Sequence, residues 1–229
     1  RIKPNGFRGF GRLNGGRMFH VLKLIINEQC IKILYFAHAM ESVDAFIIIN
    51  LNPLGHPYLD SVMKTLSSTW TLAGLLGIVL GFHVRPKALK PLLLFLFFLL
   101  IGTGICDYST NWVKHEVKRL RPSHTPGVES KLRYVTIKNT AYKGGTYGFF
   151  SSHAANTAFC CWFLWLFIKP TRNRYFIFLM LFTVLCGYSR LYMGVHYLSD
   201  VTAGWIYGTL LAFGSDFIFK RWISAKQHS

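Results

Sequence analysis

The chain has 229 residues and carries 26 Lys and Arg against 9 Asp and Glu, a formal charge of +17, yet only 15% of its residues are charged and 52% are hydrophobic. Soluble domains average about 25% charged residues, so the apolar residues must be concentrated in some stretches and the cations in others. This composition excludes a disordered chain and favours a membrane protein.

Residues 1–40 form a basic N-terminal extension of uncertain status, Gly/Arg-rich over 1–17 and weakly apolar over 18–40. It can be a sixth span, a signal peptide, or sequence upstream of a start at Met40, and we favour the last. Over 41–64 the apolar residues are interrupted at Asn50, Pro53 and Pro57, which predicts amphipathic helices lying in the outer membrane interface.

Five stretches without Asp, Glu, Lys or Arg are candidates for crossing a bilayer. They are residues 65–84, 91–106, 144–168, 175–189 and 201–215. A crossing helix needs about 20 apolar residues, so the shorter stretches require polar flanks that extend the helix. The sequence therefore predicts an all-α fold, a polytopic transmembrane helix bundle with about five spans, or six if residues 18–40 also cross. Because no Pro/Gly/Ser linker divides residues 41–229, we expect them to form a single membrane-embedded domain.

Small and sulfur-containing residues inside these stretches predict how the helices pack. Small residues recur at helical spacing in the pairs Gly77/Gly81, Ala154/Ala158 and Gly204/Gly208. Such pairs let helices approach closely in lipid. The five cysteines (Cys30, Cys106, Cys160, Cys161 and Cys186) show no metal-binding spacing, so we expect free thiols.

The basic residues of three short loops predict the orientation. They are Arg85, Lys87 and Lys90; Lys169, Arg172 and Arg174; and Lys220, Arg221 and Lys226. Cations accumulate on the cytoplasmic side, so the segment between the second and third spans, and the turn between the fourth and fifth, should face the opposite side. That outer segment is itself basic over 111–143, which favours an anion-binding site, a solvated loop or a contact with anionic lipid.

A first polar motif places Lys114 seven residues before Arg121, which Pro122 follows. Seven residues make nearly two helical turns, so the spacing predicts that both cations lie on one side of a helix with Lys118 between them. Two such cations can bind one phosphate, although a solvated helix end has the same pattern.

A second motif, Phe150-Ser151-Ser152-His153, stands at the outer start of the third span. A helix start offers free backbone N–H groups and a partial positive charge, both suited to a phosphate, and serine hydroxyls add donors. The alternative is that a serine caps the helix and His153 packs against a polar neighbour.

The third motif is Ser189-Arg190, then His196, then Asp200. His196 and Asp200 are four residues apart, so the carboxylate can accept a hydrogen bond from one ring nitrogen and leave the other free as a nucleophile. Arg190 offers a planar fork for phosphate oxygens. An interfacial His–Asp pair with a nearby arginine remains the structural alternative.

Taken in order from Lys114 to Asp200, these motifs resemble those of the phosphatidic-acid phosphatase type 2 (lipid phosphate phosphatase) superfamily, and the chain from about residue 41 onward resembles its short bacterial members. Two positions depart from the family pattern: Phe150 stands where the family has Pro, and Ser152 where it has Gly.

The resemblance implies a role for each matching residue. His196 attacks phosphorus and forms a phosphohistidine, Asp200 orients it, and His153 protonates the leaving oxygen and then activates water. The expected phosphate-binding residues are Lys114, Arg121, Ser151, Ser152 and Arg190. No metal or other cofactor is expected, because the outer face offers no cluster at ligand spacing, and vanadate should inhibit.

The expected substrate is a membrane lipid phosphate or diphosphate, such as undecaprenyl diphosphate, a lipid A phosphate, phosphatidylglycerophosphate or phosphatidic acid. The expected location is the cytoplasmic membrane of a bacterium, with the active site on the periplasmic or extracytoplasmic side. Alternatives are a vanadate-dependent haloperoxidase-like enzyme, or a non-enzymatic protein that binds anionic lipid or conducts anions. Nucleic-acid binding is not expected, because the cations are divided between two membrane faces. The sequence does not predict an oligomeric state.

Overall fold

The computed structural model describes residues 40–83, 89–137, 139–168 and 173–227. Its helices are α2 (Glu41–Leu51), α3 (Pro57–Leu66), α4 (Thr69–His83), α5 (Leu89–Val117), α6 (Ser152–Ile168), α7 (Asn173–Tyr192) and α8 (Leu198–Gln227). Short 3-10 turns cover Asn52–Leu54, Pro122–His124 and Glu129–Lys131. A two-stranded antiparallel sheet pairs β1 (Thr136–Ile137) with β2 (Thr140–Ala141). The fold is mostly helical, as predicted.

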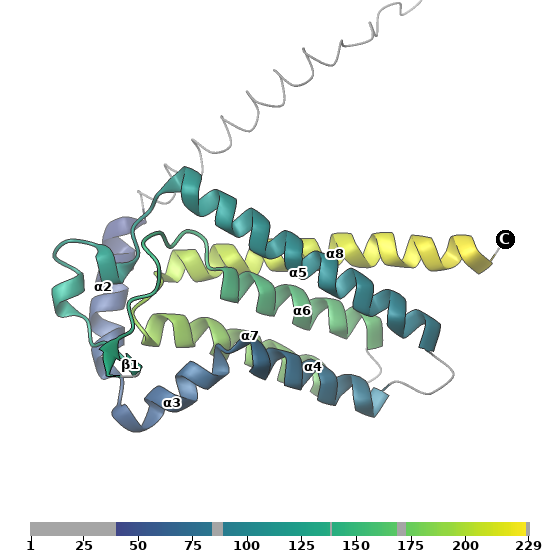
Figure 1. Ribbon diagram of the computed structural model, residues 1–229, viewed down its shortest axis with the longest axis horizontal. Helices are drawn as coiled ribbons and strands as arrows, with labels where there is room; N and C mark the ends of the chain where they lie inside the picture. The colour runs from purple at the N-terminus through teal and green to yellow at the C-terminus, as the bar shows by residue number, and fades with distance from the viewer. Residues whose placement is uncertain (1–39, 84–88, 138, 169–172, 228–229) are drawn as a thin grey trace, which may run out of the picture.

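The long helices form a bundle. One end of it is covered by α2 and by the segment between α5 and α6, and this end is called the capped end below (Figure 1). Figure 1 shows α5, α6, α7 and α8 running along the long axis of the molecule, with α2 and β1 gathered at one end. Helix α6 packs against α4, α5, α7 and α8. The chain between α5 and α6, which contains β1 and β2, contributes to the cap.

Among the described residues, two helical segments are long and apolar enough to cross a membrane, Leu89–Val117 and Tyr175–Tyr192. Helices α3 and α4 are bent by 61° at their junction and would count as a third span if taken together. Helix α6 is apolar but has only 17 residues, because the predicted span at 144–168 becomes helical only at Ser152. The predicted count of five spans is therefore not confirmed. Most cations of the first two basic loops, including Arg85 and Lys169, lie outside the described residues.

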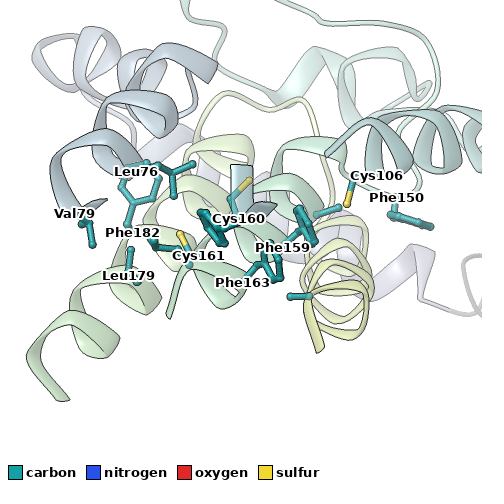
Figure 2. Packing of buried hydrophobic residues seen from close by; sticks show 14 of the residues in the cluster. Leu76, Val79, Cys106, Phe150, Phe159, Cys160, Cys161, Phe163, Leu179 and Phe182 are labelled. Carbon is teal, nitrogen blue, oxygen red and sulfur yellow. The ribbon is translucent and has the colours of Figure 1, made fainter. Parts of the chain in front are cut away.

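The hydrophobic core surrounds α6. Figure 2 shows Phe159, Cys160, Cys161 and Phe163 of this helix packed among side chains of α4, α5 and α7. Cys106, Cys160, Cys161 and Cys186 are buried free thiols, as predicted, and Cys30 lies outside the described residues. An apolar core on several sides fixes α6 in place, and His153 stands in its first turn.

Helices α6 and α8 lie close together at two glycines of α8. A Cβ added at Gly204 would lie 2.6 Å from the carbonyl oxygen of Ser151, and one at Gly208 would lie 2.1 Å from that of Ala155. The prediction of close packing is confirmed for this pair of glycines. It is wrong for Gly77 and Gly81, because in the part of the chain that the structure describes a Cβ added at either residue meets no neighbouring atom within 4 Å.

The predicted N-terminal helices are present as α2 and α3, and α2 is tied to the bundle. Asp44 and Ile48 of α2 are buried. At its end, the side-chain amide of Asn52 donates to the carbonyl oxygens of Arg133 and Tyr192, and its own oxygen accepts from the backbone N–H of Arg133. Helix α2 is therefore fixed beside the end of α7, where the third motif begins.

Candidate active site

The first motif does not form one continuous helix. Helix α5 ends at Val117, and Lys118 adopts a left-handed conformation with φ 52°. The chain then runs extended, and the backbone N–H of Arg121 donates to the carbonyl oxygen of Thr146 at 3.0 Å. The prediction that Lys114 and Arg121 share a helix face is wrong, because a left-handed residue ends the helix between them.

The second motif begins α6 and is linked to α5 by Ser152. The ammonium group of Lys114 donates to the hydroxyl of Ser152, which also lies 2.7 Å from the hydroxyl of Thr110. The side chain that replaces the family's glycine therefore points toward α5. Ser151 is fully buried, and its hydroxyl accepts a long hydrogen bond of 3.5 Å from the backbone N–H of Ala154. This is the capping contact that the sequence left open as an alternative.

The third motif spans the turn from α7 to α8. Arg190 stands in the last turn of α7. In the turn that follows, Gly194 has a φ of 67°, a backbone conformation that residues with a Cβ rarely adopt. His196 precedes α8, so its pairing with Asp200 joins the turn to the first helical turn. The Nδ1 atom of His196 lies 3.4 Å from Oδ2 of Asp200. Among the described residues, this Nδ1 atom makes no hydrogen bond.

The structure brings the predicted residues of all three motifs to the capped end of the bundle. His153 lies within range of electrostatic interaction with Arg190, His196, Lys114 and Arg121. Ser151 is joined to the third motif, because its backbone N–H donates to the carbonyl oxygen of Asp200 at 2.9 Å. Two imidazoles and three cations from distant parts of the chain therefore meet in one place.

The site carries excess positive charge. Burial, with the charge of Arg190 as the next cause, lowers the pKa of the Arg121 guanidinium. Arg190 is 2% exposed, and among the described residues its Nε has no hydrogen-bond partner, while Nη2 is 3.4 Å from the hydroxyl of Tyr142. A buried guanidinium N–H without a partner is costly, so the site favours an anion that can accept from it.

The same surroundings keep His196 uncharged. Burial, reinforced by the charges of Arg121 and Arg190, holds the pKa of His196 well below its usual value. The side chain is 1% exposed. A neutral imidazole has a free lone pair on one nitrogen, so His196 can act as a nucleophile at neutral pH.

A small cavity adjoins His153, and an apolar groove continues from it. A cavity of about 160 Å³ is lined by His153 and Ser152 together with the polar residues Asp107 and Asn156. It shares Thr69, Leu72 and Thr103 with an apolar groove of about 400 Å³ between α4 and α5. Asp107 accepts a hydrogen bond from the side-chain amide of Asn156 at 2.7 Å.

The sequence did not single out two residues behind the site. Arg119 was counted only among the cations of the basic segment, and Asp44 was part of a predicted interfacial helix. In the structure both are buried, and Arg119 bridges Asp44 and Asp200. Among the described residues, no group of three or more His, Cys, Asp and Glu side chains is arranged to hold a metal ion.

Comparison with known proteins places the chain in a family. A lipid A 4'-phosphatase of Porphyromonas gingivalis is 30% identical over 186 residues, which cover 80% of this chain and 75% of that protein. Phosphatidylglycerophosphatase B of Bacillus subtilis is 28% identical over 188 residues, covering 77% of this chain and 83% of that protein. Both relatives are named as bacterial phosphatases of lipids, and the predicted class of enzyme, a lipid phosphatase, is confirmed.

A solved structure supports the fold. The crystal structure of a transmembrane PAP2-type phosphatidylglycerolphosphate phosphatase from Bacillus subtilis matches with a TM-score of 0.61 at 22% identity, over 84% of this chain and 95% of that one. The model of the PAP2 superfamily matches residues 91–224, which include all three motifs. The chain therefore belongs to the PAP2 superfamily, as its motifs predict.

Proposed function

We propose that this protein hydrolyses a lipid phosphate or diphosphate through a phosphohistidine formed on His196. The observation that carries the proposal is the meeting of a buried, uncharged His196 with a second imidazole and three cations. This combination suits phosphoryl transfer, in which the protein mainly positions the reactants and stabilises negative charge.

In the proposed first step, the free ring nitrogen of His196 attacks phosphorus in line with the leaving oxygen. The bond from phosphorus to the leaving oxygen breaks, and His153 in its protonated form gives that oxygen a proton. Neutral His153 then takes a proton from water, and the resulting hydroxide displaces His196 from phosphorus. Inorganic phosphate is released, and both imidazoles return to their starting states.

Lys114, Arg121 and Arg190, with the hydroxyl of Ser151 and the backbone N–H of Ser152, would bind the non-bridging oxygens. Three fixed cations can compensate the charge of the transferring group, so the proposed reaction requires no metal ion. The unpartnered Nε of Arg190 supports this assignment, because a phosphate oxygen would supply the missing acceptor.

The two cavities support a lipid as the substrate. The smaller cavity reaches His153, which would protonate the leaving group, and the groove that continues from it is apolar. The leaving group can therefore occupy the smaller cavity while a hydrocarbon chain follows the groove between α4 and α5. The names of the two relatives put a lipid A phosphate and phosphatidylglycerophosphate first among the candidates. Undecaprenyl diphosphate and phosphatidic acid follow.

We further propose that residues 41–229 form one membrane-embedded domain in which α4, α5, α6, α7 and α8 all cross the bilayer. These five helices overlap the five uncharged stretches of the sequence. The active site would then lie on the outer side of the cytoplasmic membrane, at the capped end of the bundle (Figure 1). Labelling of single cysteines placed in the α2–α3 connection tests this orientation: reagents that do not cross membranes should reach them from outside the cell.

The test of the function is phosphate release by purified protein from those four lipids at a fixed detergent ratio. His196→Ala should abolish turnover, whereas His56→Ala, which alters an exposed histidine between α2 and α3, should leave it unchanged. Labelled substrate should leave phosphate on wild-type protein in a form that is labile to acid and stable to base, as phosphohistidine is. Turnover retained by His196→Ala, or no release from any of the four lipids, would refute the proposal.

A further inference from the structure

A buried chain of charged side chains lies behind the proposed nucleophile. Nη2 of Arg119 donates to Oδ2 of Asp44 at 2.7 Å, and Nη1 donates to Oδ1 of Asp200 at 2.8 Å. Asp200 in turn faces His196. The side chains of Asp44, Arg119 and Asp200 are 1%, 5% and 0% exposed, so the whole chain is shielded from water.

Ser199 forms a second connection between Arg119 and Asp44. Its hydroxyl accepts from Nη1 of Arg119 at 2.6 Å and donates to Oδ2 of Asp44, while its backbone N–H donates to Oδ1 of Asp44 at 3.0 Å. The guanidinium of Arg119 also lies over the ring of Tyr197, 4.6 Å from its centre. Arg119 is thus held in one orientation from several sides.

The consequence for Asp200 is that both of its oxygens are fixed. Oδ1 accepts from Arg119, and Oδ2 accepts from the backbone N–H of Tyr197 at 3.0 Å while facing Nδ1 of His196. A carboxylate with these partners cannot rotate away from the imidazole without breaking a buried charged hydrogen bond. Buried ion pairs contribute little net stability relative to apolar residues, so stability alone does not account for this arrangement.

We propose that Asp44 and Arg119 are positioning residues that hold Asp200 against His196, so that α2 takes part in catalysis. This inference rests on the proposed function, in which His196 is the nucleophile. In the described chain, Asp44 makes no hydrogen bond to any of the proposed phosphate-binding residues. It acts through Arg119 and Ser199.

The first test is Asp44→Asn, which removes the charge and keeps the shape of the side chain. We expect kcat to fall about tenfold or more, as is common when an outer partner of a catalytic group is lost. The KM and the inhibition by vanadate should change less than about twofold, because the groups that bind the phosphate keep their positions. A general loss of structure would instead change all three quantities.

Asp60→Asn is the matched control. Asp60 of α3 also pairs with an arginine from the segment between α5 and α6, since Nη2 of Arg133 lies 2.7 Å from both of its carboxylate oxygens. This second ion pair holds α3 against the segment between α5 and α6 at the same end of the molecule, but it makes no contact with Asp200 or His196. Asp60→Asn should therefore keep the wild-type kcat, and an equal loss of kcat in both variants would overturn the inference.

The second test is a double-mutant cycle with Asp200→Asn. If Asp44 acts through Asp200, Asp44→Asn should cost less than about twofold in kcat once Asp200 is already altered. Losses that multiply in the double variant would overturn the inference. Should Asp44→Asn not fold, Ser199→Ala, which removes only the bridging hydroxyl, takes its place in the same cycle with the same expected outcome.

The failure of this inference can be told apart from the failure of the proposed function. If His196→Ala retains turnover, the function itself is wrong. If His196→Ala abolishes turnover while Asp44→Asn and Ser199→Ala keep the wild-type kcat, only the role of the buried charges is wrong.

Discussion

The packing of α6 against α8 should be essential to the site, and Gly208→Ala tests this. A Cβ at residue 208 would lie 2.1 Å from the carbonyl oxygen of Ala155 and 2.9 Å from the backbone nitrogen of Phe159. Both contacts are with backbone, which cannot rotate away as a side chain can. Because real Cβ atoms essentially never come closer than 3.0 Å, the two helices would have to separate by about 1 Å.

A separation of this size has a cost in stability and a larger cost in rate. Overpacking a well-filled interior typically costs about 1–3 kcal/mol, which for a chain of this length lowers the melting temperature by several degrees. His153 lies two residues before Ala155 on α6, and His196 lies two residues before the start of α8. A misplacement of about 1 Å can cost about a hundredfold in rate, so we expect kcat to fall by about that factor.

The assay compares phosphate release and thermal unfolding in detergent for Gly208→Ala and Gly214→Ala. Gly214 is on the same helix, but an added Cβ there meets nothing within 4 Å. This control should keep the wild-type kcat and melting temperature. Wild-type values for Gly208→Ala, or equal losses in both variants, would refute the reasoning.

Three further predictions concern the chemistry and the substrate. Turnover should survive EDTA and be inhibited by vanadate, whereas activity lost in EDTA and restored by Mg²⁺ would contradict the assigned role of the cations. Between about pH 6.5 and pH 5 the free energy of unfolding should fall by about 2 kcal/mol more in wild type than in His196→Asn, because unfolded imidazole binds a proton below about pH 6.5 while buried His196 stays neutral. Melting curves at both pH values check the sign. Ala73→Trp, which fills the groove, should raise KM for a long-chain lipid phosphate at least about tenfold by excluding about two methylenes. The same variant should leave hydrolysis of soluble p-nitrophenyl phosphate unchanged, and Ile78→Trp on the exposed side of α4 should alter neither.

The sequence predicted which residues would meet because the three motifs combine chemistry with spacing. His196 and Asp200 are near neighbours in the chain, so their pairing follows from local geometry whether or not a helix joins them. The helix between Lys114 and Arg121 was predicted wrongly because it was inferred from their spacing alone. The helix ends at Lys118, a residue with a Cβ in a conformation that such residues rarely adopt.

The buried charges of Asp44 and Arg119 behind Asp200 could not be predicted from spacing along the chain. Asp44 and Arg119 are 75 positions apart and Asp44 and Ser199 are 155 apart, so no local spacing relates them. Arg119 lies in a basic segment where every cation is equally compatible with solvent, and only burial distinguishes it. The one available signal was Asp44 itself, a charged residue on a helix whose other residues are largely apolar.

The replacement of the family's glycine by Ser152 shows how a departure from a motif can be absorbed by its neighbours. A larger residue at this helix start would obstruct a phosphate if its side chain faced the site. Here the hydroxyl instead lies against Thr110 and Lys114 of α5. The ammonium of Lys114 has three donors, so one bond to Ser152 leaves two for phosphate oxygens. The same bond fixes the end of a long side chain, which would reduce the entropy lost when Lys114 binds the proposed phosphate. The serine would therefore preorganise the proposed phosphate-binding cation and leave the backbone N–H of Ser152 available.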